Sequence, residues 1–166
     1  MITPKEQLRD TRLVGFDVDG VFTDGRFYLS DEGVETKAFS TQDGYGIRQL
    51  IKAGIHVAII SGRKSRAVEL RMKELGVEHV FLGSPDKMAV FDRLTESLGV
   101  SPEQSVYVGD DIPDLPLLTK VGYPVAVANA VRAIREYCDY TTELPGGNGA
   151  VREVCELVLA SRDAAK

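Results

Sequence analysis

Two aspartates, Asp17 and Asp19, follow directly after the short apolar run of residues 13–16, and this arrangement constrains the chain more than any other feature. A short apolar run bounded by Gly and Asp predicts a buried β-strand. Because a buried carboxylate is costly unless it is paired or bound to a cation, we place both aspartates where the strand ends. In an open α/β sheet the carboxyl ends of the strands border the ligand crevice. A turn that merely favours Asp and Gly is the alternative interpretation.

The rest of the chain alternates between short apolar strands and helices, several of which are followed by glycine. Further strands are predicted over residues 56–60, 80–82, 105–108 and 124–127, and helices over residues 47–53, 65–75, 86–98, 114–121, 130–137 and 150–160. This alternation predicts a doubly wound α/β fold with a parallel sheet and right-handed crossovers. Two extended segments around the turn at residues 30–33 predict a β-hairpin over about residues 25–39.

Length and composition indicate one globular domain over residues 1–166, with 43% hydrophobic and 27% charged residues. A net charge of −5 argues against a nucleic-acid-binding surface. No apolar run approaches the roughly 20 residues that span a bilayer, and the N-terminus lacks the apolar core of a signal peptide. Cys138 and Cys155 form no metal-binding motif, so we expect reduced thiols. These features predict a cytoplasmic protein without a membrane or nucleic-acid partner.

Polar residues follow the predicted strands, and in a parallel sheet these strand ends share one edge. They are Asp17 and Asp19 after the first strand, Ser61, Gly62 and Arg63 after the second, Lys87 after the third, and Asp110, Asp111 and Asp114 after the fourth. Crowded carboxylates repel one another unless a cation is present. Mg²⁺ prefers carboxylate oxygens and usually arrives with phosphate. We therefore predict a magnesium site where Ser61, Lys87 and Arg63 hold the phosphate of a small-molecule substrate.

The predicted chemistry is phosphoryl transfer through a covalent intermediate. Asp17 directly ends the strand and is the candidate nucleophile, which would form an aspartyl-phosphate. Asp19 lies farther out, so it is the candidate that protonates the leaving alkoxide and later activates water. The metal and Lys87 would neutralise charge on the transferring phosphoryl group.

The aspartate pair, Ser61, Lys87 and the acidic segment 109–114 together resemble the four motifs of the haloacid dehalogenase superfamily. The resemblance implies the sheet order 3-2-1-4-5, in which the first and fourth strands are neighbours. It also implies Mg²⁺ held by Asp17, by the main-chain carbonyl of Asp19, and by Asp110. Asp114 matches a further acidic position of the superfamily, whereas the role of Asp111 is left open.

Longer segments resemble the 3-deoxy-D-manno-octulosonate 8-phosphate phosphatases, namely residues 17–25, 37–39, 43–47, 59–64 and 146–153. The resemblance implies release of phosphate from an eight-carbon keto acid 8-phosphate that is used in lipopolysaccharide synthesis. Related phosphatases act on nine-carbon sialic-type 9-phosphates, and an acidic residue is expected there in place of Arg63. Arg63 therefore favours the eight-carbon substrate. Thr23, Gly44 and Gly62 complete the residues for which we predict contact with substrate or phosphate.

The intervals between Asp17 and Ser61 and between Ser61 and Lys87 are each shorter than the roughly 50 residues that a separate cap domain needs. We expect the hairpin to close the site by packing against other subunits, and the resemblance implies a homotetramer. A monomer with an unused hairpin is the alternative. The glycine-rich segment, about residues 145–149, predicts a mobile lid to which Arg152 adds charge. The alternative is a tether for the helix that follows.

Two other classes of protein remain open at this point. A receiver-like phospho-acceptor domain also combines strand-end aspartates with a hydroxyl, a lysine and Mg²⁺, but it leaves the Asp17–Asp19 pair and the hairpin without a role. A catalytically silent binding subunit is the second alternative. Measured release of phosphate from sugar phosphates separates both of them from a phosphatase.

Overall fold

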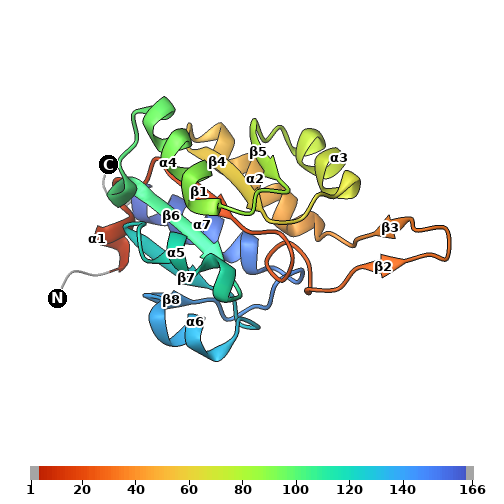
Figure 1. The fold of residues 1–166 in the computed structure, drawn as a ribbon. Helices are drawn as coiled ribbons and strands as arrows, with labels where there is room; N and C mark the ends of the chain where they lie inside the picture. Colours follow the sequence, from red (N-terminus) through yellow and green to blue (C-terminus); the bar gives the residue numbers. More distant parts are fainter. Residues whose placement is uncertain (1–3, 164–166) are drawn as a thin grey trace.

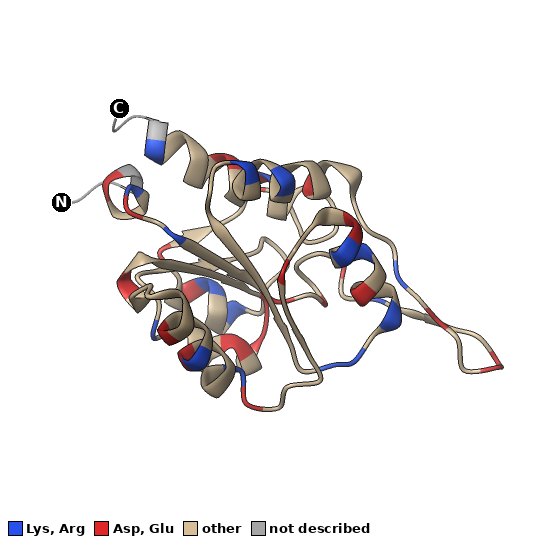
Figure 2. Ribbon diagram, turned by 90° about the horizontal axis from the view of Figure 1, so that it is seen from above, with Lys and Arg blue, Asp and Glu red and all other residues tan. Residues whose placement is uncertain are grey.

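The computed structural model describes residues 4–163 and contains one parallel six-stranded sheet with helices on both sides (Figures 1 and 2). The strands, in spatial order, are β5 (His79–Leu82), β4 (His56–Ser61), β1 (Leu13–Phe16), β6 (Ser105–Gly109), β7 (Tyr123–Ala126) and β8 (Tyr140–Thr141). The predicted order 3-2-1-4-5 is confirmed, and β8 adds an edge strand that was not predicted. Because β1 is central, its carboxyl end lies between those of β4 and β6.

The helices follow the predicted alternation, although several of their ends differ. They are α1 (Pro4–Leu8), α2 (Thr41–Lys52), α3 (Arg66–Leu75), α4 (Lys87–Leu98), α5 (Leu115–Leu118), α6 (Arg132–Tyr137) and α7 (Ala150–Asp163). Short 3₁₀ turns occupy Pro102–Gln104 and Ile112–Asp114. The second turn replaces the start of the helix predicted over residues 114–121. None of the helices within residues 4–163 is long and apolar enough to cross a membrane.

Helix α2 begins at Thr41, six residues before the start of the helix predicted over residues 47–53. Ser40 caps the helix, since its hydroxyl accepts a hydrogen bond from the N–H of Asp43 at 3.4 Å. Gly46 lies inside the helix, and a Cβ there would come within 3.1 Å of the Cys155 side chain on α7. The glycine therefore permits close packing of α2 against α7.

Strand β1 is fully buried, and one of its residues allows a core side chain to reach the strand ends. Gly15 is paired in register with Tyr107 of β6. A Cβ on Gly15 would lie 2.9 Å from the Tyr107 ring, so glycine leaves room for that ring to cross β1. The Tyr107 hydroxyl is thereby brought to the polar edge of the sheet, where it donates to Asp114.

The predicted hairpin is present and extends away from the sheet (Figure 1). Strands β2 (Tyr28–Leu29) and β3 (Glu35–Thr36) are antiparallel. Tyr28, Leu29 and Val34 are all exposed by more than 60% of their surface. As predicted, the described residues contain no separate cap domain between β1 and the helices that follow.

Candidate active site at the carboxyl end of the sheet

Asp17 and Lys87 form a buried ion pair at the end of β1. The N–H of Asp17 donates to the carbonyl of Val108 at 3.0 Å, so the residue continues the β1–β6 ladder by one position. The Lys87 ammonium, in the first turn of α4, lies 2.9 Å from Asp17 Oδ1 and 2.8 Å from Asp114 Oδ1. Burial alone would lower the pKa of Lys87, but the two carboxylates raise it overall. The lysine is therefore held as a cation between two acids.

Asp114 organises the loop after β6. Its Oδ2 accepts hydrogen bonds from the N–H groups of Asp110 and Asp111, at 3.0 and 3.3 Å. Its Oδ1 accepts the hydroxyl of Tyr107 at 3.1 Å as well as the ammonium of Lys87. Because both oxygens of Asp114 are used in this way, the residue orients its neighbours. Asp111 lies on the exposed side and accepts a hydrogen bond from the N–H of Ile112 at 2.8 Å.

Three carboxylates meet beside this lysine and provide an all-oxygen donor set. One oxygen from each of Asp17, Asp110 and Asp114 lies within 4.8 Å of the others. Burial and the charge of Asp114 raise the pKa of Asp17 to about 6. Burial, Asp17 and Asp114 raise the pKa of Asp110 to about 8. Within residues 4–163 the Asp110 carboxylate receives no hydrogen bond, which leaves its oxygens available to a ligand. A hard cation such as Mg²⁺ prefers carboxylate oxygens and would offset the repulsion that raises the pKa values of Asp17 and Asp110.

The loop that carries Asp19 lies directly against Asp110. Gly20 has a φ of +86°, and a Cβ there would lie 2.0 Å from Asp110 Oδ2. Only glycine fits at this position, both for its backbone conformation and for the space. The structure thus brings Asp17, the Asp19–Gly20 backbone and Asp110 together, as the sequence motifs implied.

The side chain of Asp19 points to the base of the hairpin, where it meets two cations. The buried ammonium of Lys37 donates a hydrogen bond to Asp19 Oδ1 and also lies 3.7 Å from Glu35 Oε1. Arg63 Nε lies 3.8 Å from Asp19 Oδ2. Lys37 and Glu35 were not predicted as site residues. The sequence signal for Lys37 was its place in the segment 37–39 that resembles the phosphatase family, and Glu35 was marked only as part of the predicted hairpin.

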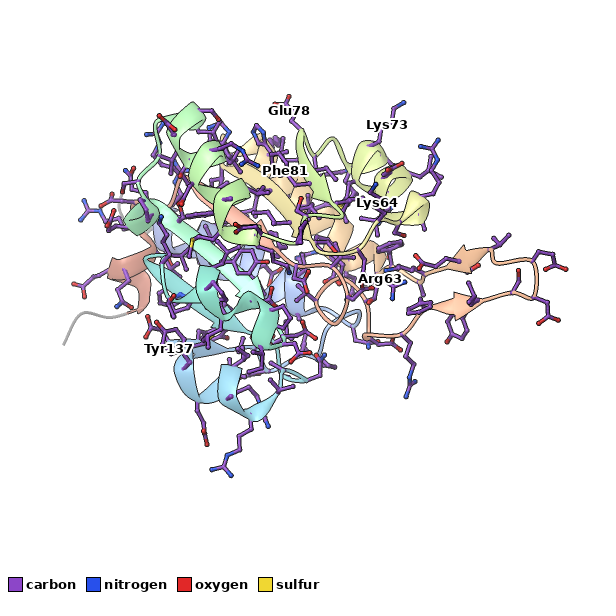
Figure 3. All side chains as sticks on the ribbon, in the orientation of Figure 1. Arg63, Lys64, Lys73, Glu78, Phe81 and Tyr137 are labelled. Carbon is purple, nitrogen blue, oxygen red and sulfur yellow. The ribbon has the colours of Figure 1, made fainter. Side chains whose placement is uncertain are left out.

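Ser61, Gly62 and Arg63 lie at the end of β4, as predicted. Ser61 is buried, and its hydroxyl accepts a hydrogen bond from the N–H of Arg63 at 3.3 Å. The Arg63 guanidinium donates to Glu35 Oε2 at 2.7 Å, and its central carbon lies 4.0 Å from the centroid of the Phe27 ring. Figure 3 shows this half-exposed arginine beside the base of the hairpin.

Thr23 and Gly44 each have a structural role in the fold, and their contact with substrate stays a prediction. The Thr23 hydroxyl is buried and accepts the N–H groups of Gly20 at 3.3 Å and Gly25 at 3.2 Å. It therefore shapes the loop that carries the aspartates. Gly44 lies in α2, where a Cβ would come within 2.4 Å of the Arg71 guanidinium.

The glycine-rich segment at residues 145–149 packs against the loop after β1 of the same chain. The N–H of Gly147 donates to the carbonyl of Val21 at 3.1 Å. A Cβ on Gly146 would lie 1.9 Å from the carbonyl oxygen of Gly20. Close contact between two backbones therefore accounts for these glycines, a reason that differs from the mobility predicted from composition.

The chain is similar to several known proteins. A family model described as haloacid dehalogenase-like hydrolase matches residues 80–153. The 3-deoxy-D-manno-octulosonate 8-phosphate phosphatase of Escherichia coli is 48% identical over 151 residues, which cover 91% of this chain and 80% of that protein. The crystal structure of the Yersinia pestis phosphatase of the same name matches with a TM-score of 0.94 and 44% identity, over 96% of this chain and 86% of that one. The Moraxella catarrhalis structure, a complex with magnesium, phosphate and KDO, matches with a TM-score of 0.93 and 42% identity, over 98% and 95% of the two chains.

Proposed function

The chain belongs to the 3-deoxy-D-manno-octulosonate 8-phosphate phosphatases, a family of haloacid dehalogenase-like hydrolases, and from this premise we propose which of its residues carry out the reaction. It is a Mg²⁺-dependent phosphoric monoester hydrolase that converts 3-deoxy-D-manno-octulosonate 8-phosphate to the free keto acid and phosphate, in lipopolysaccharide biosynthesis. The observation that carries the residue assignment is the buried contact of Lys87 with Asp17, beside Asp110 at the end of the central strand.

Asp17 is the nucleophile in this proposal, and Asp19 is the acid and base. An oxygen of Asp17 attacks phosphorus, the bond from phosphorus to the sugar oxygen breaks, and Asp19 gives that oxygen a proton. Asp19 then takes a proton from water, whose oxygen attacks the aspartyl-phosphate and releases phosphate and Asp17. Lys87 holds Asp17 Oδ1 at 2.9 Å, which orients the carboxylate for attack.

Charge on the phosphoryl oxygens is balanced by groups at the same strand ends. Lys87 supplies a fixed positive charge, and the Ser61 hydroxyl lies at the end of the adjacent strand β4. The carboxylates of Asp17 and Asp110 would hold Mg²⁺ together with the main-chain carbonyl of Asp19. The ion, when bound, acts as a Lewis acid on the phosphoryl group.

Arg63 supports recognition of the distal end of the substrate. Its guanidinium is positioned by Glu35 and by the face of Phe27, while almost half of the side chain remains exposed to solvent. A guanidinium presents paired donors that match a carboxylate, which the eight-carbon keto acid carries. We therefore propose that Arg63 favours this substrate over nine-carbon sialic-type 9-phosphates.

The assembly and location of the protein are also part of the proposal. The exposed apolar residues Tyr28, Leu29 and Val34 lie on the projecting hairpin, and such a patch on one element is typical of a subunit contact. We propose that residues 1–166 act as one domain within a homotetramer built through the hairpins. Cys138 and Cys155 are both free thiols, which supports a reducing cytoplasmic location.

An assay of phosphate release tests the proposal directly. The eight-carbon 8-phosphate, a nine-carbon 9-phosphate and p-nitrophenyl phosphate are compared with Mg²⁺ and with EDTA. We expect sustained turnover only with metal, and the highest kcat/KM for the eight-carbon substrate. A single uptake of phosphate without turnover would identify a receiver-like domain instead, and equal kcat/KM on both sugars would remove the argument from Arg63.

A further inference from the structure

We propose that Asn129 is a positioning residue for this reaction, because its side-chain amide ties the loop carrying Asp19 and Gly20 to the glycine-rich segment and so holds Gly20 against Asp110. The inference rests on the proposed function, since it concerns the geometry of the same site. Asn129 lies after β7, between that strand and α6, and it matches none of the motifs that pointed to the site.

Both polar atoms of the Asn129 side-chain amide form hydrogen bonds. Its Nδ2 donates to the carbonyl of Gly20 at 3.0 Å, and its Oδ1 accepts the N–H of Gly146 at 2.6 Å. The two partners fix the orientation of the amide, because a carbonyl requires a donor and an N–H requires an acceptor. Part of Asn129 is exposed, but the two glycines that it joins are buried. One residue therefore adds a side-chain bridge between two backbones that also share the hydrogen bond from Gly147 to Val21.

The backbone around Asn129 is itself anchored to the site. The N–H of Val131 donates to the main-chain carbonyl of Asp110 at 2.9 Å. The amide of Asn129 consequently bridges from the Asp110 side of the site to the Gly20 side. A Cβ on Gly20 would lie 2.0 Å from Asp110 Oδ2, so the loop leaves no space for a side chain beside the carboxylate.

The far end of the glycine-rich segment is anchored as well. Asp43 of α2 is fully buried, and its Oδ1 accepts the N–H of Arg152 in the first turn of α7 at 3.0 Å. This bond gives α7 an N-terminal cap from a different helix. Because Asp43 fixes the start of α7 and the Val131 N–H ties the backbone near Asn129 to Asp110, the amide of Asn129 holds Gly20 from anchored segments.

Substitution of Asn129 tests the proposal, with Asn148 as the matched control. Asn129→Asp keeps an acceptor for Gly146 but loses the donor to Gly20, and Asn129→Leu loses both. Asn148 lies exposed in the same segment, and its side-chain amide donates to the carbonyl of Gly146 at 3.4 Å. Mg²⁺ affinity is measured without substrate, from the metal-induced rise in the thermal unfolding midpoint, and kcat and KM are measured at saturating metal.

We expect Asn129→Asp to bind Mg²⁺ at least about tenfold more weakly and to lose a similar factor in kcat, as partners of metal ligands typically do. The added negative charge would by itself strengthen binding of a cation, so weaker binding reports the lost donor. Asn148→Asp should stay within about twofold of the wild type on both measures. If Asn129→Leu fails to fold, the Asp variant decides alone.

A merely structural role would lower the unfolding midpoint of the metal-free protein while Mg²⁺ affinity and kcat stay within about twofold of the wild type, and that result would overturn the proposal. Failure of the proposed function looks different, since the wild-type chain would then release no phosphate from the eight-carbon substrate. The comparison of Mg²⁺ affinities would still decide the role of Asn129 in that case.

Discussion

The ammonium of Lys87 lies 2.9 Å from the carboxylate of Asp17, although 70 positions separate the two residues in the chain. The same ammonium lies 2.8 Å from Asp114, so one buried cation serves two buried acids. Removing the cation leaves uncompensated charge, whereas removing either acid leaves the other paired. Loss of an acid is therefore the cleaner probe of chemistry at this site.

Asp17→Asn should abolish phosphate release while the protein stays folded. The amide cannot act as the nucleophile, and Lys87 keeps its ion pair with Asp114. We expect turnover below about 1% of the wild type with saturating Mg²⁺, and an unchanged circular dichroism spectrum. Asp10→Asn, at an exposed position before β1, is the matched control and should retain full activity. Turnover clearly above about 1% would rule out covalent catalysis by Asp17.

The stability of the metal-free protein should fall as pH rises. The pKa values of Asp17 and Asp110 in the folded protein are raised to about 6 and about 8, from 3.8. A raised pKa of an acid means that the folded state holds its proton more tightly, so these groups destabilise the fold progressively from about pH 4 to pH 8. Mg²⁺ pairs with the ionised carboxylates and removes this loss.

Thermal unfolding at pH 6 and pH 8, with and without Mg²⁺, measures the effect. The metal-free midpoint should be lower at pH 8, and the rise caused by Mg²⁺ should be larger there. Asp110→Asn removes the carboxylate with the higher pKa and should flatten the pH dependence. If the metal-free midpoint were no lower at pH 8 than at pH 6, the raised pKa values of the crowded carboxylates would be contradicted.

The strand ends of this fold could be predicted from sequence because each is marked locally. Asp17 and Asp110 directly follow β1 and β6, Ser61 is the last residue of β4, and parallel strand ends must share one edge. The order of the strands came instead from resemblance to a family, since apolar runs of similar length do not state which pairs are neighbours. Strand β8 was missed because two residues carry too little pattern.

Residues whose task depends on a distant neighbour could not be predicted in this way. Tyr107 has the pattern of a core strand residue, and its hydroxyl reaches Asp114 only because Gly15 on the next strand has no side chain. Lys37 is distinguished only by burial against Asp19, which the hairpin creates. Gly46 preceded the predicted helix, whereas it lies inside α2, where the absence of a side chain lets α7 pack closely.

Arg63→Met should impair the natural substrate selectively. The guanidinium lies at the hairpin base and would pair with the distal carboxylate of the sugar acid, which a small aryl ester lacks. We expect kcat/KM to fall about 10- to 100-fold for the eight-carbon phosphate and by less than about threefold for p-nitrophenyl phosphate. Arg66→Met on the exposed side of α3 is the control and should change neither. Equal losses on both substrates would assign Arg63 to the phosphate.

The wild-type protein should sediment at about four times the 18.1 kDa mass of the chain. Leu29→Asp places a charge on the exposed apolar tip of the hairpin and should shift the protein to smaller species. Leu70→Asp makes the same change on α3, where Leu70 is also exposed, and should leave the mass unchanged. Sedimentation equilibrium measures both. A wild-type mass near 18.1 kDa would exclude the tetramer.

The variant Gly146→Ala tests whether the glycine-rich segment is a fixed support for the loop after β1 or a mobile lid over the substrate. Truncation is unsuitable for this purpose, because Val151 and Val154 of the following helix are fully buried in the core. A Cβ on Gly146 would lie 1.9 Å from the Gly20 carbonyl oxygen, so the added methyl must push the segment and the loop after β1 apart. If the segment supports the loop, kcat falls by the same factor, at least about tenfold, for the sugar phosphate and for p-nitrophenyl phosphate, since both need the aspartates in place.

A lid would give a different result from the same variant. It would hold the distal carboxylate and hydroxyls of the sugar, so the loss would be confined to the natural substrate. Gly54→Ala is the matched control: Gly54 also requires glycine, with a φ of +75°, but a Cβ there has no atom within 4 Å. It should cost about 1 kcal/mol of stability and leave both activities intact. Steady-state kinetics at a temperature where all three proteins are folded decides, and we expect equal fractional losses on the two substrates in Gly146→Ala alone.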